Sequence, residues 1–189
     1  MKITETLYVD KREEWRRWLE THRQDKTEIW LVSHRKHTGR ANLSYNDAVE
    51  EALCFGWIDS IRKTVDKDRY AQRFTPRKKG SAFSQINKER LGRLINQGKV
   101  HPEVLAGLGD VRPESFQFPG DILAALKADD NAWNFFRNTP PAYQRIRAAY
   151  VEAARSRPEE FEKRLRNLVR KSSGRIQFGH DIETYYQTP

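Results

Sequence analysis

The chain has 189 residues and a mass of 22.3 kDa, enough for one ordinary domain or for a compact domain with a small appendage. A single cysteine, Cys54, excludes an internal disulfide, and no apolar run approaches the roughly 18 residues of a membrane-spanning helix. The formal charge of +9 and the pI near 9.7 favour an anionic partner, provided that the positive charge is concentrated somewhere.

The first segments read as two strands around one helix. Alternation of apolar and polar residues predicts a strand over 3–9, after which Asp10 is expected to cap a helix with Trp15, Trp18 and Leu19 on its apolar face. Residues 28–35 are apolar enough for a well-buried strand, and 36–43 should form a loop.

The next segments predict a helix followed by a hairpin. Ser44 with Asp47 resembles a capping box, and Gly56 should end the helix because glycine enters the left-handed conformation at low cost. Strands are expected over 57–65 and 69–76, joined by a turn at 66–68. A further helix should begin at a Ser84 cap and end at Gly98.

Beyond Val111 the pattern is helical. Asp121 and Ser156 are the expected caps of two helices, and Pro141 suits a first helical turn. The predicted fold class is therefore α+β: a small, mostly antiparallel sheet with packed helices, followed by a C-terminal helical module. The expected boundaries are an α+β domain at 1–110, the helical module at 118–174 and a tail at 175–189.

Positive charge is concentrated in residues 69–99, which we call the basic segment. It carries nine cations against Glu89 alone, a net charge of +8. Such a concentration favours contact with phosphate, carboxylate or nucleic acid, although a solvated basic face is the simpler alternative. The nine cations are Arg69, Arg73, Arg77, Lys78, Lys79, Lys88, Arg90, Arg93 and Lys99.

The hairpin carries the main candidate site. If its turn centres on Lys67, Asp59 lies opposite Thr75 and diagonal to Arg73 and Arg77, within reach of both guanidinium groups. Trp57 shares the face of Asp59, so the group could hold a planar anion. A register slip of one residue would move the arginines to the other face, and Asp59 could equally be a structural ion-pair partner.

Three classes of function remain open at this stage. The first is binding of a small anionic ligand or acidic partner in a pocket of Trp57, Asp59, Arg73 and Arg77, rimmed by Lys78, Ser84 and Asn87. The second is nucleic-acid binding by the basic segment, with bases stacked on Trp57, Phe74 and Phe83. The third is an enzyme that uses Asp59 as an acid or base, which flanking arginines would disfavour.

Other reactive residues give weaker signals. Cys54 falls near the end of a predicted helix, where the helix dipole disfavours a thiolate, so a core position is expected. His34 and His37 point to opposite faces of a strand, and no further ligand completes a zinc set. No metal, cofactor or phosphate-binding loop is predicted.

The same residues resemble those of a known family, the bacterial YdeI/OmpD-associated proteins, whose members are labelled bacteriocin-protection proteins. The resemblance is carried by 30–32, 36–39, 44–60 and 72–78, continues through Ser84, Asn87 and Arg90, and is looser at 119–122 and the helical end. It implies a bacterial cytoplasmic protein with a protective or stress-related role and no established reaction. We expect no membrane insertion, and the sequence does not indicate an oligomeric state.

Overall fold

The computed structural model describes residues 2–179, which divide into two compact units. Unit 1 comprises 1–82 and 93–110, and unit 2 comprises 83–92 and 111–189, the described limits applying at both ends. The helix α3 (Gln85–Asn96) contributes its first residues to unit 2 and its last to unit 1. Both units contain helices and only unit 1 contains a sheet in the described residues, so the fold class is α+β, as predicted.

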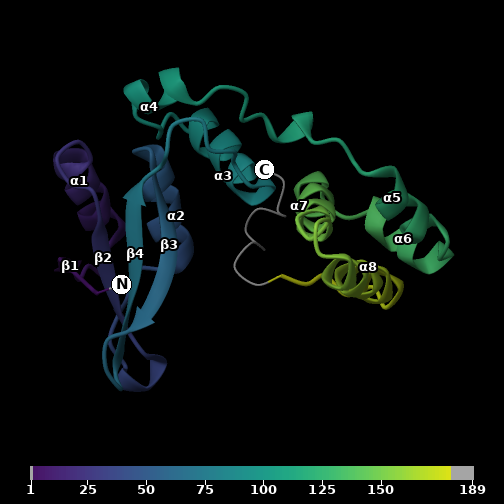
Figure 1. Cartoon of the computed structure of the whole chain (residues 1–189), viewed down its shortest axis with the longest axis horizontal. Coiled ribbons are helices and arrows are strands. Elements are labelled where there is room, and N and C mark those ends of the chain that lie inside the picture. Colours follow the sequence, from purple (N-terminus) through teal and green to yellow (C-terminus); the bar gives the residue numbers. More distant parts are fainter. Residues whose placement is uncertain (1, 180–189) are drawn as a thin grey trace. The chain divides into compact units, whose positions relative to one another are not determined.

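Unit 1 is built on a four-stranded mixed sheet with the order β1-β2-β4-β3 (Figure 1). The short β1 (Thr6–Leu7) runs parallel to β2 (Ile29–His34), and the other pairings are antiparallel. The hairpin of β3 (Trp57–Thr64) and β4 (Arg69–Pro76) is present as predicted. Two helices, α1 (Arg12–His22) and α2 (Tyr45–Cys54), pack against each other, and α2 packs against β3.

The predicted first strand was too long. Only Thr6 and Leu7 pair with β2, although the alternating pattern runs over 3–9. Further along β2, the side chain of Asn42 accepts a hydrogen bond from the His34 amide at 2.6 Å and donates one to the His34 carbonyl at 2.9 Å. This amide therefore satisfies the backbone groups of His34, the last residue of β2, in place of a neighbouring strand.

Helix starts were predicted less well than helices. The Ser44 hydroxyl accepts from the Asp47 amide at 3.1 Å, which confirms that cap, and Gly56 follows α2 with φ of 74°. The expected caps at Asp10, Asp121 and Ser156 were wrong, because the residues in the cap position are Lys11 for α1, Pro119 for the helix at Gly120–Lys127 and Arg157 for the helix at Pro158–Ser173. Proline in the first turn helps set the start of the last helix.

Two short elements follow β2 and α3 in unit 1. These are the 3-10 turn η1 (Lys36–Thr38), within the expected loop, and α4 (Pro102–Gly107), which sequence patterns did not predict. The unit 1 core is rich in aromatic rings: Trp15 stacks on Trp18 with centroids 5.3 Å apart and meets the edge of Phe74 at 5.4 Å. The buried rings of Trp15 and Phe74 connect α1 to the sheet.

Unit 2 is helical in its described part (Figure 1). After the 3-10 turn η2 (Pro113–Ser115) come α5 (Gly120–Lys127), α6 (Asp130–Arg137), α7 (Pro141–Glu152) and α8 (Pro158–Ser173). The helix α8 packs against α5, α6 and α7 around an apolar core. No helix in the described residues is both long and apolar enough to cross a lipid bilayer.

The first part of α3 is bonded to unit 2 by side chains. Gln85 donates to the Pro113 carbonyl at 3.0 Å, and Glu89 accepts two hydrogen bonds from Arg145 of α7 at 2.6 and 2.9 Å. Gly92 approaches Pro113 so closely that a Cβ there would lie 2.9 Å from the proline ring. Residues 83–92 therefore group with the helices, whereas the sequence pattern placed them with the sheet.

Candidate functional site

The register of the hairpin differs from the prediction at the residue that matters most. Beyond Arg62 the predicted pairing holds, with Arg62 opposite Gln72. An irregularity between Asp59 and Arg62 shifts the pairing of residues 57–59 by one residue. Asp59 therefore lies opposite Phe74 and not Thr75. A bulge of this kind places an extra residue in one strand, and the alternating hydrophobic pattern does not reveal it.

The shift separates Asp59 from one of its expected arginines. Since Asp59 faces the same side as Phe74, the neighbouring Arg73 points to the opposite face of the sheet. The half-buried Asp59 carboxylate instead accepts a hydrogen bond from the Tyr45 hydroxyl at 2.9 Å. The prediction that Arg73 flanks Asp59 is therefore wrong.

Arg73 has a structural partner from a distant part of the chain. Its Nε donates to the Glu28 carboxylate at 2.6 Å. The Thr4 hydroxyl also donates to this carboxylate, and these two bonds hold the pKa of Glu28 below its usual range. Arg73 thus ties β4 to the residue before β2 in this structure.

Trp57 is a core residue. Its side chain is buried at 1% exposure, its Nε1 donates to the Arg23 carbonyl at 3.2 Å, and its ring meets the edge of Trp18. A ring in this position cannot offer the exposed stacking surface that the sequence suggested. Phe74 is equally buried, which removes a second ring from the proposed nucleic-acid surface.

A short turn after β4 retains exposed positive charge. This basic turn, residues 77–80, carries Arg77, Lys78 and Lys79. The Arg77 guanidinium donates to the carbonyls of Ser81 and Ala82 at 2.9 and 3.1 Å, and partial burial lowers its pKa. Lys78 and Lys79 are exposed, and no described carboxylate forms an ion pair with either.

Most of the remaining excess charge in the basic segment is neutralised or buried. Carboxylates from outside the segment pair with three of its cations: Asp66 with Arg69, Glu28 with Arg73 and Glu50 with Arg93. Arg90 is buried at 3% exposure. A count along the sequence therefore overstated the charge that this segment presents to a partner.

The last two predicted rim residues, Ser84 and Asn87, belong to unit 2. The Ser84 carbonyl accepts from the amides of Asn87 and Lys88 at 3.0 Å, so this residue begins the α3 hydrogen-bond pattern. The Asn87 side chain accepts from Arg90 at 2.9 Å. Both roles are local to the start of α3.

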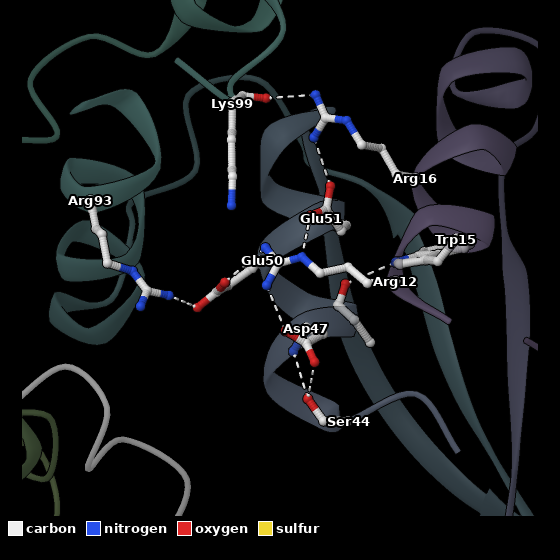
Figure 2. A network of polar contacts seen from close by, with 10 residues as sticks. Arg12, Trp15, Arg16, Ser44, Asp47, Glu50, Glu51, Arg93 and Lys99 are labelled. Carbon is white, nitrogen blue, oxygen red and sulfur yellow. Dashed lines mark hydrogen bonds and ion pairs between the residues drawn. The ribbon is translucent and has the colours of Figure 1, made fainter. Parts of the chain in front are cut away.

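Unit 1 also contains a polar network that the sequence patterns did not predict (Figure 2). Its centre is Arg12 of α1, which bonds three carboxylates of α2: Asp47 at 2.6 Å, Glu50 at 2.9 Å and Glu51 at 2.5 Å. Glu50 and Glu51 are each only 2% exposed. We call this group, together with Arg16 and Arg93, the α1–α2 network.

Two more cations complete the charge balance of the network. Arg16 donates to Glu51 at 2.7 Å and to the Lys99 carbonyl at 3.0 Å, and Arg93 bonds Glu50 (Figure 2). Burial alone would lower the pKa of Arg12, but the bonds to Glu51 and Glu50 outweigh it and raise that pKa above its ordinary range. The carboxylates are thus closed off by guanidinium groups and unavailable to a ligand.

Cys54 lies at the edge of this network. Burial, followed by the charge of Glu51, raises the pKa of its thiol to about 11, so the thiol is protonated near neutral pH. This agrees with the expected core position. One signal of the network was visible in the sequence: two adjacent glutamates lie among the inward-facing Ala48, Val49, Ala52 and Leu53, so α2 is buried on more than one side.

Comparison with known proteins identifies two regions of the chain. A family profile described as a domain of unknown function (DUF8412) matches residues 7–107, which is most of the hairpin-bearing part. A second profile, described as Bacteriocin-protection, YdeI or OmpD-Associated, matches residues 115–174. No curated protein and no solved structure matches significantly. The motifs at 30–78 that mainly carried the resemblance lie within the first match, whereas 119–122 and the helical end lie within the second. The chain therefore belongs to the DUF8412 family over more than half its length, and its helical part is similar to YdeI/OmpD-associated proteins, the family that the sequence resembles.

Proposed function

We propose that this protein has a protective role and binds a small anionic ligand or an acidic partner through the basic turn, residues 77–80. The observation that carries the proposal is the exposure of Lys78 and Lys79, adjacent lysines without an ion-pair partner among the described carboxylates. The protective role rests on the printed description of the family that matches the helical part.

The basic turn is held in shape by hydrogen bonds from Arg77 to residues outside it, which favours a binding role for the lysines. Arg77 bonds two carbonyls and the Ser81 hydroxyl, and its backbone amide donates to the Gly56 carbonyl at 2.9 Å. Gly80 adopts φ of 77°, a conformation that side chains rarely tolerate. An anion would therefore meet two ammonium groups on a shaped turn, and little ordering of the backbone would be lost on binding.

This site is smaller than the pocket expected from the sequence. Trp57 is buried and Arg73 is paired with Glu28, so neither is assigned to the ligand. Asp59 with Tyr45 forms a separate polar pair on β3 and α2. The proposed contacts are Lys78 and Lys79, with Arg77 as a positioning residue.

Nucleic-acid binding is the alternative, since the same lysines could contact phosphates. The burial of Trp57 and Phe74 argues against base stacking by these two rings. The two functions also differ in their response to salt. Binding to nucleic acid would release counterions, so its affinity should fall steeply as salt increases.

A thermal-shift experiment on the purified full chain would test the proposal. The ligands would be inorganic phosphate, citrate, a nucleoside triphosphate and a short single-stranded DNA, each at low and moderate salt. The variant is Lys78→Gln/Lys79→Gln, and the matched control is Lys36→Gln/Lys67→Gln, which removes two exposed lysines elsewhere in unit 1. A ligand at one hundred times its dissociation constant should add about 2.7 kcal/mol of stability.

The expected result is a shift with one small anion that the basic-turn variant loses and the control retains. Equal shifts in both variants would contradict the proposal. A shift with DNA alone, fading as salt rises, would favour the nucleic-acid alternative. Survival of bacteriocin-challenged cells that express either variant would test the protective role separately.

A further inference from the structure

Unit 2 contains a buried arginine in an aromatic setting. Arg147 of α7 is 8% exposed. Its guanidinium carbon lies 5.1 Å from the ring centroid of Phe178, 5.7 Å from Tyr150 and 5.9 Å from Tyr143. Three rings therefore surround one cation, an arrangement in which each ring presents electron density to the guanidinium.

The charge of Arg147 has no carboxylate partner in residues 2–179. Its Nε is buried and makes no hydrogen bond. Arg145, two residues earlier on the same helix, shows the contrast, because Glu89 accepts from its Nε and Nη2. A guanidinium has five N–H donors, and aromatic rings can stabilise its charge without providing the acceptors that these donors require.

The main chain closes one side of this arginine. A Cβ at Gly179 would lie 2.5 Å from Nη1 of Arg147 and 2.8 Å from Nη2. Gly179 adopts φ of 106°, in the region where side chains are strained. Glycine at this position therefore lets the backbone approach the guanidinium, so the surroundings of Arg147 combine rings, backbone and an unsatisfied donor.

We propose that Arg147 is the anchor of a second anion site, in unit 2, for a small oxyanion such as a phosphate or a carboxylate. The buried ring of Tyr143 and the half-buried ring of Phe178 form apolar walls on two sides of the guanidinium, which strengthens a charge-assisted hydrogen bond. The site is independent of the basic turn and would exist even if that turn bound nothing. Both phosphate and carboxylate oxygens match the guanidinium fork, so the experiment compares the two.

The test uses the full chain and inorganic phosphate, acetate and chloride at matched ionic strength. Proton–nitrogen NMR of arginine Nε groups reports directly on Arg147, and its signal is assigned as the one missing in Arg147→Lys. We expect this signal to move saturably with phosphate or acetate and not with chloride. The same response should persist in Lys78→Gln/Lys79→Gln, which separates it from the basic turn.

Melting temperatures provide a second measurement. In the Lys78→Gln/Lys79→Gln background, where the basic turn cannot contribute, Arg147→Met should lose the anion-specific rise, with at least a tenfold weaker apparent affinity. Arg137→Gln, which removes an arginine of α6 whose side chain donates to Asn134 at 3.1 Å, should keep that rise. An Nε signal that does not move, or equal shifts in Arg147→Met and wild type, would overturn the proposal.

One further variant tests whether carboxylates of this chain bind the Arg147 guanidinium in place of an external anion. Asp181→Asn/Glu183→Gln removes two carboxylates that follow Gly179 in the sequence. If this variant binds phosphate at Arg147 and the wild type does not, the chain's own carboxylates occupy the guanidinium and the proposal of an external anion is wrong. If both bind alike, the external anion is supported.

Discussion

The α1–α2 network of unit 1 and Arg147 of unit 2 bury charge in opposite ways. In the network, Glu50 and Glu51 are each bonded by guanidinium groups from distant segments, so each buried carboxylate has more than one cation (Figure 2). Arg147 is surrounded by three aromatic rings, and no described carboxylate pairs with it. The charges of the α1–α2 network balance one another, whereas the charge of Arg147 is not balanced by any described carboxylate.

Whether a buried charge has a partner distinguishes structural charges from charges that can bind a ligand better than the distribution of charge along the chain does. A buried charge with several partners is expensive to disturb and has little left to offer a ligand. A buried charge without a counterion contributes little to stability and can gain from an anion. The four predictions below test this contrast, starting with the largest expected effect.

Removal of one network carboxylate should have the largest effect. Glu51→Ala leaves Arg12 and Arg16 without a shared partner inside unit 1, and we expect a loss of about 3 kcal/mol of unfolding free energy. Urea denaturation would measure it. The control Glu5→Ala breaks an exposed ion pair with Lys26 and should change the midpoint far less. Equal effects of the two variants would mean that the network is not a major source of stability.

Alkaline pH should weaken the protein through Cys54. Its thiol pKa is raised from 9.0 to about 11, so the folded state holds this proton more tightly than the unfolded state. The resulting stability is present in full below pH 9 and is lost as pH rises towards 11, a change of about 2 to 3 kcal/mol. Denaturation from pH 8 to 11 should show a shallower decline in Cys54→Ala than in wild type. Parallel declines would contradict the assignment.

The cap at the start of α2 should have an intermediate effect. The Ser44 hydroxyl accepts from the Asp47 amide and donates to the Asp47 carboxylate, which in turn bonds Arg12. Ser44→Ala should cost about 1 kcal/mol, whereas Ser44→Asn should recover most of the loss because asparagine is also a good cap. Urea denaturation of both variants would check this. A loss that Ser44→Asn does not recover would place the effect in the hydroxyl's bond to Asp47 instead.

Loss of Arg147 should have the smallest effect on stability. Arg147→Met removes the ring contacts and also removes a buried charge that lacks a counterion, so the two changes should cancel to within about 1 kcal/mol. The matched control is Arg145→Met, which breaks the pair with the buried Glu89 and should be clearly more destabilising. A severe loss in Arg147→Met measured without added anions would show that the rings and backbone already compensate the cation.

Elements with strong local signals could be predicted from the sequence. The hairpin, the helix capped by Ser44 and the glycine that ends it depend on neighbours in the sequence, and all three are present. Strand pairing was predicted only as far as the bulge, because the alternation of side chains does not reveal an extra residue between Asp59 and Arg62. Because of that one residue, Arg73 and Asp59 lie on opposite faces of the sheet, and the predicted site with Arg73 and Arg77 beside Asp59 does not form.

The sequence alone determined the α+β class, the basic segment and the resemblance to YdeI/OmpD-associated proteins, because composition, periodicity and motifs are properties of neighbouring residues. Only the tertiary structure decided which charges are paired. Glu28 reaches Arg73, and Glu50 reaches Arg93, across more than forty residues each. Ion pairing and burial depend on distances in space, so a charge count along the chain could locate the basic turn but could not distinguish its exposed lysines from cations already neutralised by the fold.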